Sequence, residues 1–234
     1  MVPAFDRHIL EALNQWVHVW PRFDVFVEFL SYSSLFKGVL FTVVMWWVWF
    51  SSAEPEVAMH KRQIILGILT GCLLGMFVAR VLVHAFPERP RPLHNTELTL
   101  RPVRAQLVAD SKDRSSFPSD HATLFFALAT GFCFLSWRLG VAALLYVVVF
   151  VCLPRVYLDL HYPTDLLAGG LVGALAAVLC NLPALRQRLY APLLAWQRRH
   201  PSPFYVGLFL MTYQIDDMFN GIRQLLSFMF GNGN

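Results

Sequence analysis

The sequence predicts an all-α integral membrane protein, a bundle of about five to six transmembrane helices with an interfacial N-terminal helix. Three observations favour this fold class. Only 15% of the 234 residues are charged, whereas a soluble globular protein carries about 25%. Several apolar runs approach or exceed the roughly 20 residues that a helix needs to cross a bilayer. Tryptophans also gather at the end of one such run, as in the aromatic belts of membrane proteins.

The first two predicted segments differ in character. Asp6 can cap a helix that runs to about residue 19 and is closed by Pro21. This helix is amphipathic, so we expect it to lie at the membrane interface. The next segment continues through residues 31–34 into the apolar run LFKGVLFTVVMWWVWF. Because tryptophans close that run, we expect a true span here.

The remaining apolar runs predict four further spans, at residues 63–86, 119–137, 139–157 and 164–182. A long polar loop, residues 87–117, separates the first of these from the others. After a basic connector, residues 204–230 form an amphiphilic segment that contains Asp216, Asp217 and Arg223. This segment either crosses the membrane or lies along it.

The chain shows no internal repeat, and we expect residues 1–234 to form one membrane domain. Residues 1–34 would supply interfacial helices that lead into the membrane, 35–182 the catalytic core spans, and 183–234 a connector and the C-terminal helix. Alternation of the spans places the long loop on one side. The other side receives most of the basic residues of the short connections, so the positive-inside rule makes that other side cytoplasmic.

Composition argues against other kinds of binding site. The net charge of +4 is scattered, with no basic stripe and interleaved aromatics, so we expect no nucleic-acid partner. The four cysteines fall in apolar runs without CxxC spacing and are best interpreted as buried apolar side chains. No cluster has the pattern of metal ligands, and we expect neither a metal nor a cofactor.

Three polar clusters stand at the ends of predicted spans on the outer side. They are HAFPERPRP (residues 84–92), FPSDHA (117–122) and PRVYLDLHYPTD (154–165). Ionisable groups at membrane depth are costly unless they face a cavity, so a functional site is the expected explanation.

The last cluster contains a histidine that can act as a nucleophile. Pro163 is placed to begin a helix, and Asp165 in its first turn can accept a hydrogen bond from the His161 ring. Such a bond fixes the tautomer and leaves the other ring nitrogen free to attack. Arg155, at the end of the preceding span, has a planar fork that suits phosphate oxygens. An interfacial His–Asp pair beside an anchoring arginine is the alternative.

The middle cluster begins a helix at Pro118 and Ser119, whose free N–H groups make an anion site. His121 stands at its mouth as a candidate proton donor. An ordinary helix cap with a histidine at the headgroup level explains the same residues.

The first cluster contributes Arg89 and Arg91, each followed by a proline. Both also fit lipid-headgroup anchors. Arg80, one turn before His84, is deeper than an anchor should be, so it either pairs with Asp159 or another acid or faces the pocket.

Together the clusters supply phosphate-binding arginines, a helix N-terminus, two histidines and a carboxylate, a set that matches phosphoryl transfer through histidine. In order, they resemble the three signature motifs of the type 2 phosphatidic acid phosphatase (PAP2) superfamily: Lys-x6-Arg-Pro, Pro-Ser-Gly-His and Ser-Arg-x5-His-x3-Asp. The match runs from His84 to Asp165. The resemblance implies a PAP2-like helical bundle and a metal-independent lipid phosphatase.

The resemblance also assigns a role to each matching residue. His161 is similar to the nucleophile that forms a phosphohistidine, Asp165 to its orienting partner, and His121 to the general acid. The residues that resemble phosphate ligands are Arg91, Ser119 and Arg155, with Asp120 through its backbone and His84 as further candidates, while Arg80 and Arg89 are candidates for support.

Three positions depart from the family pattern. His84 stands where the motif has lysine, Pro154 replaces a serine, and Asp120 replaces a glycine. The charge of His84 would depend on pH, and Arg80 could replace it. The Asp120 carboxylate is expected to point away from the phosphate or to hold a neighbouring donor.

The SFPSDHA variant resembles bacterial undecaprenyl-diphosphate phosphatases of the bacitracin-resistance type. This resemblance implies an isoprenoid lipid phosphate as substrate and a site on the outer face of the bacterial inner membrane. A phosphatidic acid or phosphatidylglycerophosphate phosphatase and a lipid phosphotransferase remain alternatives. A proton-coupled transporter is a remote one, because the sequence shows neither inverted repeats nor broken helices.

Overall fold

The computed structural model describes residues 2–104 and 115–218, and within them the regular structure is helical throughout. The elements in chain order are α1 (Ala4–Asn14), α2 (Pro21–Tyr32), η1 (Leu35–Val39), α3 (Leu40–Phe50), α4 (Pro55–Ala85), η2 (Pro92–His94), α6 (Asp120–Leu135), α7 (Trp137–Tyr146), η3 (Val147–Cys152), α8 (Leu153–Tyr157), α9 (Pro163–Cys180), α10 (Pro183–Leu185), η4 (Arg186–Tyr190), α11 (Ala191–Arg199) and α12 (Pro201–Asp216). The predicted all-α membrane fold is confirmed.

Within the described residues, three helical stretches are long and apolar enough to cross a membrane: Pro55–Ala85, Trp137–Tyr157 and Pro163–Cys180. The segment that leads through residues 31–34 into the predicted span is bent by 66° between α2 and the helix that starts at Leu35, and the bent pair would make a fourth. Ser33 adopts an extended conformation after α2, which interrupts the helix. The apolar helix α6 is shorter, with 16 residues.

The two chain ends differ in part from the prediction. The helix expected to reach residue 19 ends at Asn14, and Pro3 rather than Asp6 is its N-cap. Asp6 lies inside the first turn with its side chain fully buried. At the other end α12 covers the first part of the predicted amphiphilic segment, and residues 219–230 of that segment lie outside the described residues.

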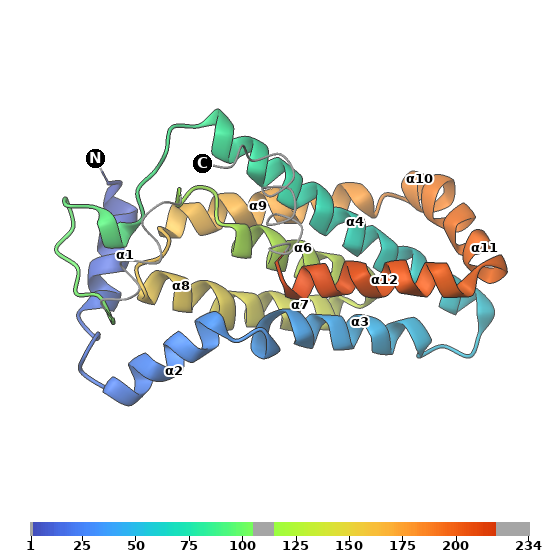
Figure 1. Ribbon diagram of the computed structural model, residues 1–234, viewed down its shortest axis with the longest axis horizontal. Helices are drawn as coiled ribbons and strands as arrows, with labels where there is room; N and C mark the ends of the chain where they lie inside the picture. Colours follow the sequence, from blue (N-terminus) through green and yellow to red (C-terminus); the bar gives the residue numbers. More distant parts are fainter. Residues whose placement is uncertain (1, 105–114, 219–234) are drawn as a thin grey trace, which may run out of the picture.

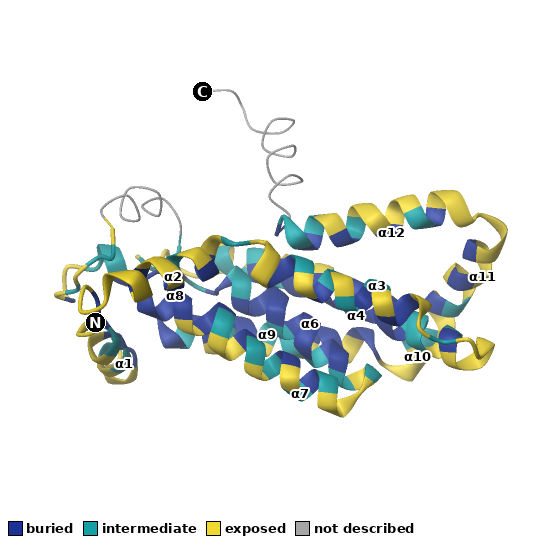
Figure 2. Cartoon of the chain, turned by 90° about the horizontal axis from the view of Figure 1, so that it is seen from below, coloured by how far each residue is buried: buried dark blue, intermediate teal, exposed yellow. Residues whose placement is uncertain are grey.

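Helices α4, α6 and α9 pack against one another and form the centre of the bundle (Figure 1). Figure 2 shows buried residues concentrated in this centre and exposed residues along much of α12. Small residues permit the close packing. A Cβ at Gly169 would lie 2.5 Å from the Ser119 carbonyl oxygen, and one at Gly173 would lie 2.0 Å from that of Thr123. These glycines therefore set how closely α9 approaches the first turn of α6.

The close contact between Gly173 and the Thr123 backbone predicts that one added methyl group strongly lowers the stability of the protein. Gly173→Ala should destabilise the protein by about 1–3 kcal/mol, as overpacking does, because the methyl group meets backbone rather than a movable side chain. Gly207→Ala on α12 is the matched control, since no atom lies within 4 Å of its added Cβ. That variant should be neutral or slightly stabilising. Thermal unfolding in detergent measures both, and equal melting temperatures would contradict this account of the packing.

Candidate active site

The three polar clusters lie at one end of the bundle, where α8 ends and α9 begins beside α1 (Figure 1). Backbone hydrogen bonds join them. The Ser119 N–H donates to the Asp165 carbonyl oxygen at 3.2 Å, and the Leu93 N–H donates to that of Asp159 at 3.1 Å. The Ser116 N–H donates to the Arg89 carbonyl oxygen at 2.9 Å. Segments far apart in sequence are thus held together by main-chain contacts.

His161 lies in the turn between α8 and α9 and is buried. Its Nδ1 is 2.9 Å from the carbonyl oxygen of Ser116, but 3.9 Å from Oδ2 of Asp165. The hydrogen bond expected between this ring and Asp165 is therefore not formed. Because a carbonyl oxygen can only accept, Nδ1 carries the proton, and Nε2 of the neutral ring keeps its lone pair. Burial, followed by the charges of Arg91 and Arg155, holds the pKa of His161 well below its usual range.

Asp165 is fully buried in the first turn of α9 and is held by other partners. Its Oδ2 accepts the Tyr162 N–H at 2.9 Å, and its Oδ1 accepts a hydrogen bond from Arg89 at 2.5 Å. The Arg89 guanidinium also lies over the Tyr162 ring, 3.9 Å from its centroid. Asp165 thus fixes the backbone next to His161 rather than the imidazole itself.

Asp6 of α1 is a second buried carboxylate in this network, although its sequence position predicts only a helix cap. Arg89 donates to Oδ2 of Asp6 at 2.8 Å, and the Thr164 N–H and hydroxyl donate to the same carboxylate at 2.9 and 2.6 Å. Arg89 therefore bridges two buried carboxylates. In the sequence, the available signal was that Asp6 falls on the same helical face as Leu10 and Asn14.

His121 and Arg155 meet at the start of α6. Arg155 Nη2 hydrogen-bonds to Nε2 of His121 and donates to the Ser31 carbonyl oxygen at 3.1 Å. A guanidinium has no acceptor, so this contact requires an unprotonated Nε2 on His121. Ser119 is the N-cap of α6, where its buried side-chain oxygen accepts the Ala122 N–H at 3.4 Å. The expected helix start at Ser119 is therefore present.

Arg91 belongs to the first cluster and reaches the last one. Its Nη1 donates to the Leu160 carbonyl oxygen at 3.4 Å, and its charge acts on the neighbouring His161. His84, in contrast, is exposed in the last turn of α4. Within the described residues, it takes no part in the contacts that join the three clusters.

The deeper Arg80 is paired with Asp120, and not with Asp159 as one alternative suggested. The carboxylate that replaces the motif glycine thus holds a neighbouring donor. Asp159 instead accepts a hydrogen bond from the Asn14 amide at 2.9 Å, and burial raises its pKa to about 8. The first contact holds Arg80 against the residue before His121. The second links Asp159 to α1.

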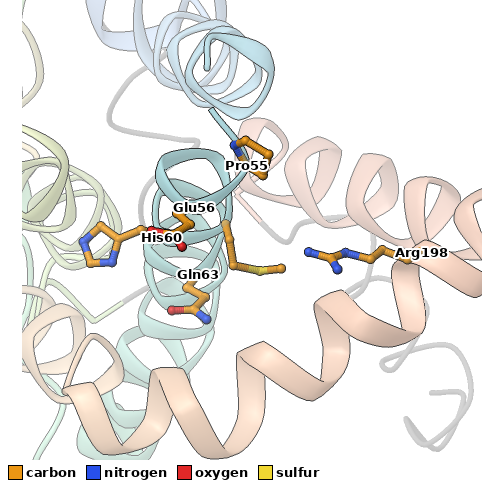
Figure 3. A pocket seen from close by; sticks show the side chains of 6 residues that line it. Pro55, Glu56, His60, Gln63 and Arg198 are labelled. Carbon is orange, nitrogen blue, oxygen red and sulfur yellow. The ribbon is translucent and has the colours of Figure 1, made fainter. Parts of the chain in front are cut away.

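A separate pocket of about 340 Å³ lies at the other end of α4. Its lining residues are Pro55, Glu56, Met59, His60, Gln63 and Arg198. Figure 3 shows the Arg198 side chain reaching toward α4, whereas the His60 side chain lies on the opposite side of that helix. The first turns of α4 line this pocket, and the polar clusters adjoin the last turns. Since α4 has 31 residues and rises about 1.5 Å per residue, the pocket is far from the clusters.

Comparison with known proteins gives consistent results. Residues 64–187 match the profile of the PAP2 superfamily. The Escherichia coli (strain K12) protein named "Putative undecaprenyl-diphosphatase YbjG" is 32% identical over 171 residues, which cover 71% of this chain and 77% of that protein. "Bacitracin transport permease protein BcrC" of Bacillus licheniformis is 40% identical over 65 residues, 27% of this chain and 31% of that protein. No solved structure matches the chain significantly.

Proposed function

The chain belongs to the PAP2 superfamily, and we propose that it converts undecaprenyl diphosphate to undecaprenyl phosphate and inorganic phosphate. The observation that carries this proposal is the neutral His161, with Nε2 available, among the arginines of three matching clusters. The similarity to the Escherichia coli protein supports the substrate. The match to a protein named for bacitracin transport supports the predicted bacitracin-resistance subfamily.

In the first step, Nε2 of His161 attacks the terminal phosphorus, and an N–P bond forms as the bond to the bridging oxygen breaks. The electron pair of that bond stays with the departing lipid phosphate. Phosphate oxygens replace His121 as the partner of Arg155, so Nε2 of the ring can take up a proton from water and donate it, as general acid, to the departing oxygen. Arg91, Arg155, Ser119 and the first N–H groups of α6 surround the transferring group, and such oriented donors supply much of the rate.

In the second step, water attacks the phosphohistidine with His121 as general base. The N–P bond breaks, phosphate leaves, and the neutral ring of His161 returns. Asp165 acts as a positioning residue that holds the turn before α9 through the Tyr162 N–H. This sequence of steps needs no metal ion or cofactor.

We further propose that the protein is a multi-pass protein of the bacterial inner membrane with its active site facing the periplasm. The apolar helices support membrane insertion. The basic connector after α9, which contains Arg186, Arg188, Arg198 and Arg199, supports a cytoplasmic location for the opposite end. The single-domain organisation and its predicted subdivision remain part of this proposal.

A substrate panel on purified protein tests the function. Phosphate release from undecaprenyl diphosphate, phosphatidic acid and phosphatidylglycerophosphate is compared in detergent without divalent ions, with His161→Ala as the blank. We expect the diphosphate to give the highest kcat/KM. A higher value for a glycerophospholipid would replace the proposed substrate by that alternative, and phosphate transfer to an added lipid acceptor would indicate a phosphotransferase. Absence of release from every lipid would contradict the phosphatase and favour the transporter.

Asp6→Asn tests the network behind the nucleophile. The change weakens the hold on Arg89 and Thr164, so the turn that carries His161 loses part of its support. We expect kcat to fall by about tenfold to a hundredfold, as small misplacements of reacting groups do, with KM changed less than twofold. Glu11→Gln, an exposed position on the same helix, is the control and should leave both constants unchanged. A rise in KM at constant kcat would contradict the positioning role.

A further inference from the structure

Lys37 is a buried cation that belongs to none of the three clusters. It lies in η1, just after the bend between α2 and α3, and only 8% of its surface is exposed. Its Nζ donates to the Ser31 carbonyl oxygen at 2.6 Å, and Arg155 donates to the same oxygen at 3.1 Å. One carbonyl therefore holds an ammonium and a guanidinium group side by side.

These two cations lack a close counterion. Within the described residues, neither Lys37 nor Arg155 lies within ion-pair distance of a carboxylate, and Nε of Arg155 is buried without a hydrogen-bond partner. The two charges repel each other, while Asp216 of α12 attracts Lys37 and Asp120 attracts Arg155, each from beyond ion-pair distance. Burial of adjacent cations without a paired anion is unfavourable, so this arrangement suits a bound anion.

The contacts also indicate where such an anion would lie. They run from His121 to Arg155, from Arg155 to the Ser31 carbonyl, and from that carbonyl to Lys37. Lys37 is therefore connected to the general acid, which faces the departing group, whereas His161 is bonded to Ser116. An anion held by Lys37 would be part of the departing group.

We propose that Lys37, together with Arg155, binds the lipid-proximal phosphate of a lipid diphosphate and so favours diphosphates over monophosphates. This inference rests on the proposed phosphatase function. When the bond between the terminal phosphorus and the bridging oxygen breaks, the electron pair adds negative charge to the departing phosphate, next to the ammonium group. A lipid monophosphate departs as an alcohol and places no phosphate at Lys37.

A binding experiment tests the subsite without turnover. Inorganic pyrophosphate and inorganic phosphate are titrated into detergent-purified wild type, Lys37→Met and Lys37→Arg. Lys37→Met should weaken pyrophosphate binding about tenfold to a hundredfold, the loss expected for one hydrogen bond to a charged group. It should change phosphate binding less than twofold, and Lys37→Arg should keep most of the pyrophosphate affinity. Equal weakening of both anions, or of neither, would overturn the proposal.

Kinetics on lipids separates this inference from the proposed function. Lys37→Met should lower kcat/KM for undecaprenyl diphosphate at least about tenfold more than for phosphatidic acid. Glu11→Gln, an exposed change on α1, is the control and should leave the ratio of the two substrates unchanged. An unchanged ratio in Lys37→Met would reject the subsite while the wild-type activity still supports the phosphatase. If wild type hydrolysed no lipid phosphate, the function would fail, and the pyrophosphate titration would still decide whether Lys37 binds an anion.

The stability of the Lys37→Met protein excludes a folding artefact. Methionine is unbranched and apolar, and it replaces a buried charge that has no paired carboxylate in the described part of the chain. Its melting temperature should therefore equal or exceed that of wild type. A clear loss of stability would show that Lys37 supports the fold and would contradict the proposal.

Discussion

Replacing His161 by asparagine should lower phosphate release by a factor on the order of 10³ to 10⁶, the range found when a covalent nucleophile is removed. The asparagine amide can still donate to the Ser116 carbonyl oxygen, which now accepts from Nδ1 of His161. The variant thus keeps the local hydrogen bond and loses only the attacking nitrogen. Steady-state phosphate release with undecaprenyl diphosphate measures the effect.

Two controls accompany this prediction. The melting temperature of His161→Asn should stay close to that of wild type, because the turn before α9 is held by Asp165 and Arg89 rather than by the imidazole. Pyrophosphate binding should also persist, since the cations that surround the site are retained. Activity within tenfold of wild type would reject His161 as the nucleophile.

Replacing His121 by glutamine is the second change with a large expected effect, and its kinetic form depends on the departing group. With phosphatidic acid the departing oxygen becomes an alcohol, so loss of the general acid should slow the first step by about 10²- to 10⁴-fold. With a lipid diphosphate the departing group is a phosphate with a second pKa of about 6, which depends on protonation by His121 far less than an alcohol does. The first step should then remain fast.

The second step needs His121 as a base with either substrate. With undecaprenyl diphosphate, His121→Gln should therefore release one equivalent of lipid phosphate rapidly and then turn over slowly, with a phosphorylated enzyme accumulating. With phosphatidic acid no burst should appear. Rapid-quench measurement of the lipid product follows both reactions. Identical burst behaviour for the two substrates would contradict the assignment of His121 as acid in one step and base in the other.

The arrangement of the three clusters was predictable because membrane spans alternate in direction. Each cluster stands at a span end, so residues as distant as Arg91, Ser119 and His161 were expected on the same side of the bundle. The start of α6 at Ser119 and of α9 at Pro163 followed from ordinary capping preferences.

The supporting network could not be predicted in the same way. Asp6 contacts Arg89, 83 residues away in the chain, and Thr164, 158 residues away. No periodic pattern in a sequence specifies contacts over such separations. The acceptor of the His161 ring is the backbone carbonyl of Ser116, an atom that every residue possesses. Spacing alone favoured Asp165 at four residues, but the first turn of α9 directs its carboxylate toward the Tyr162 N–H.

The contacts of Lys37 could not be predicted from the sequence for a related reason. Lys37 lies inside a run that predicts a continuous span, and the side chain of a single lysine in a span ordinarily extends toward the membrane surface. The bend of 66° after α2 changes that direction and places Lys37 against Ser31 and Arg155. The extended conformation of Ser33 that causes the bend has no strong signal in a stretch of serines and a tyrosine.

The central claim is that phosphoryl transfer passes through His161. The most direct test uses undecaprenyl diphosphate labelled with ³²P in its terminal phosphate, mixed with the His121→Gln protein and quenched in base. The account predicts label on the protein that is stable to base, labile to acid and located at residue 161 by peptide mass spectrometry. Label should be absent from the double variant that also carries His161→Asn. Full label in that double variant, or phosphate release from His121→Gln without any labelled protein, would contradict the account.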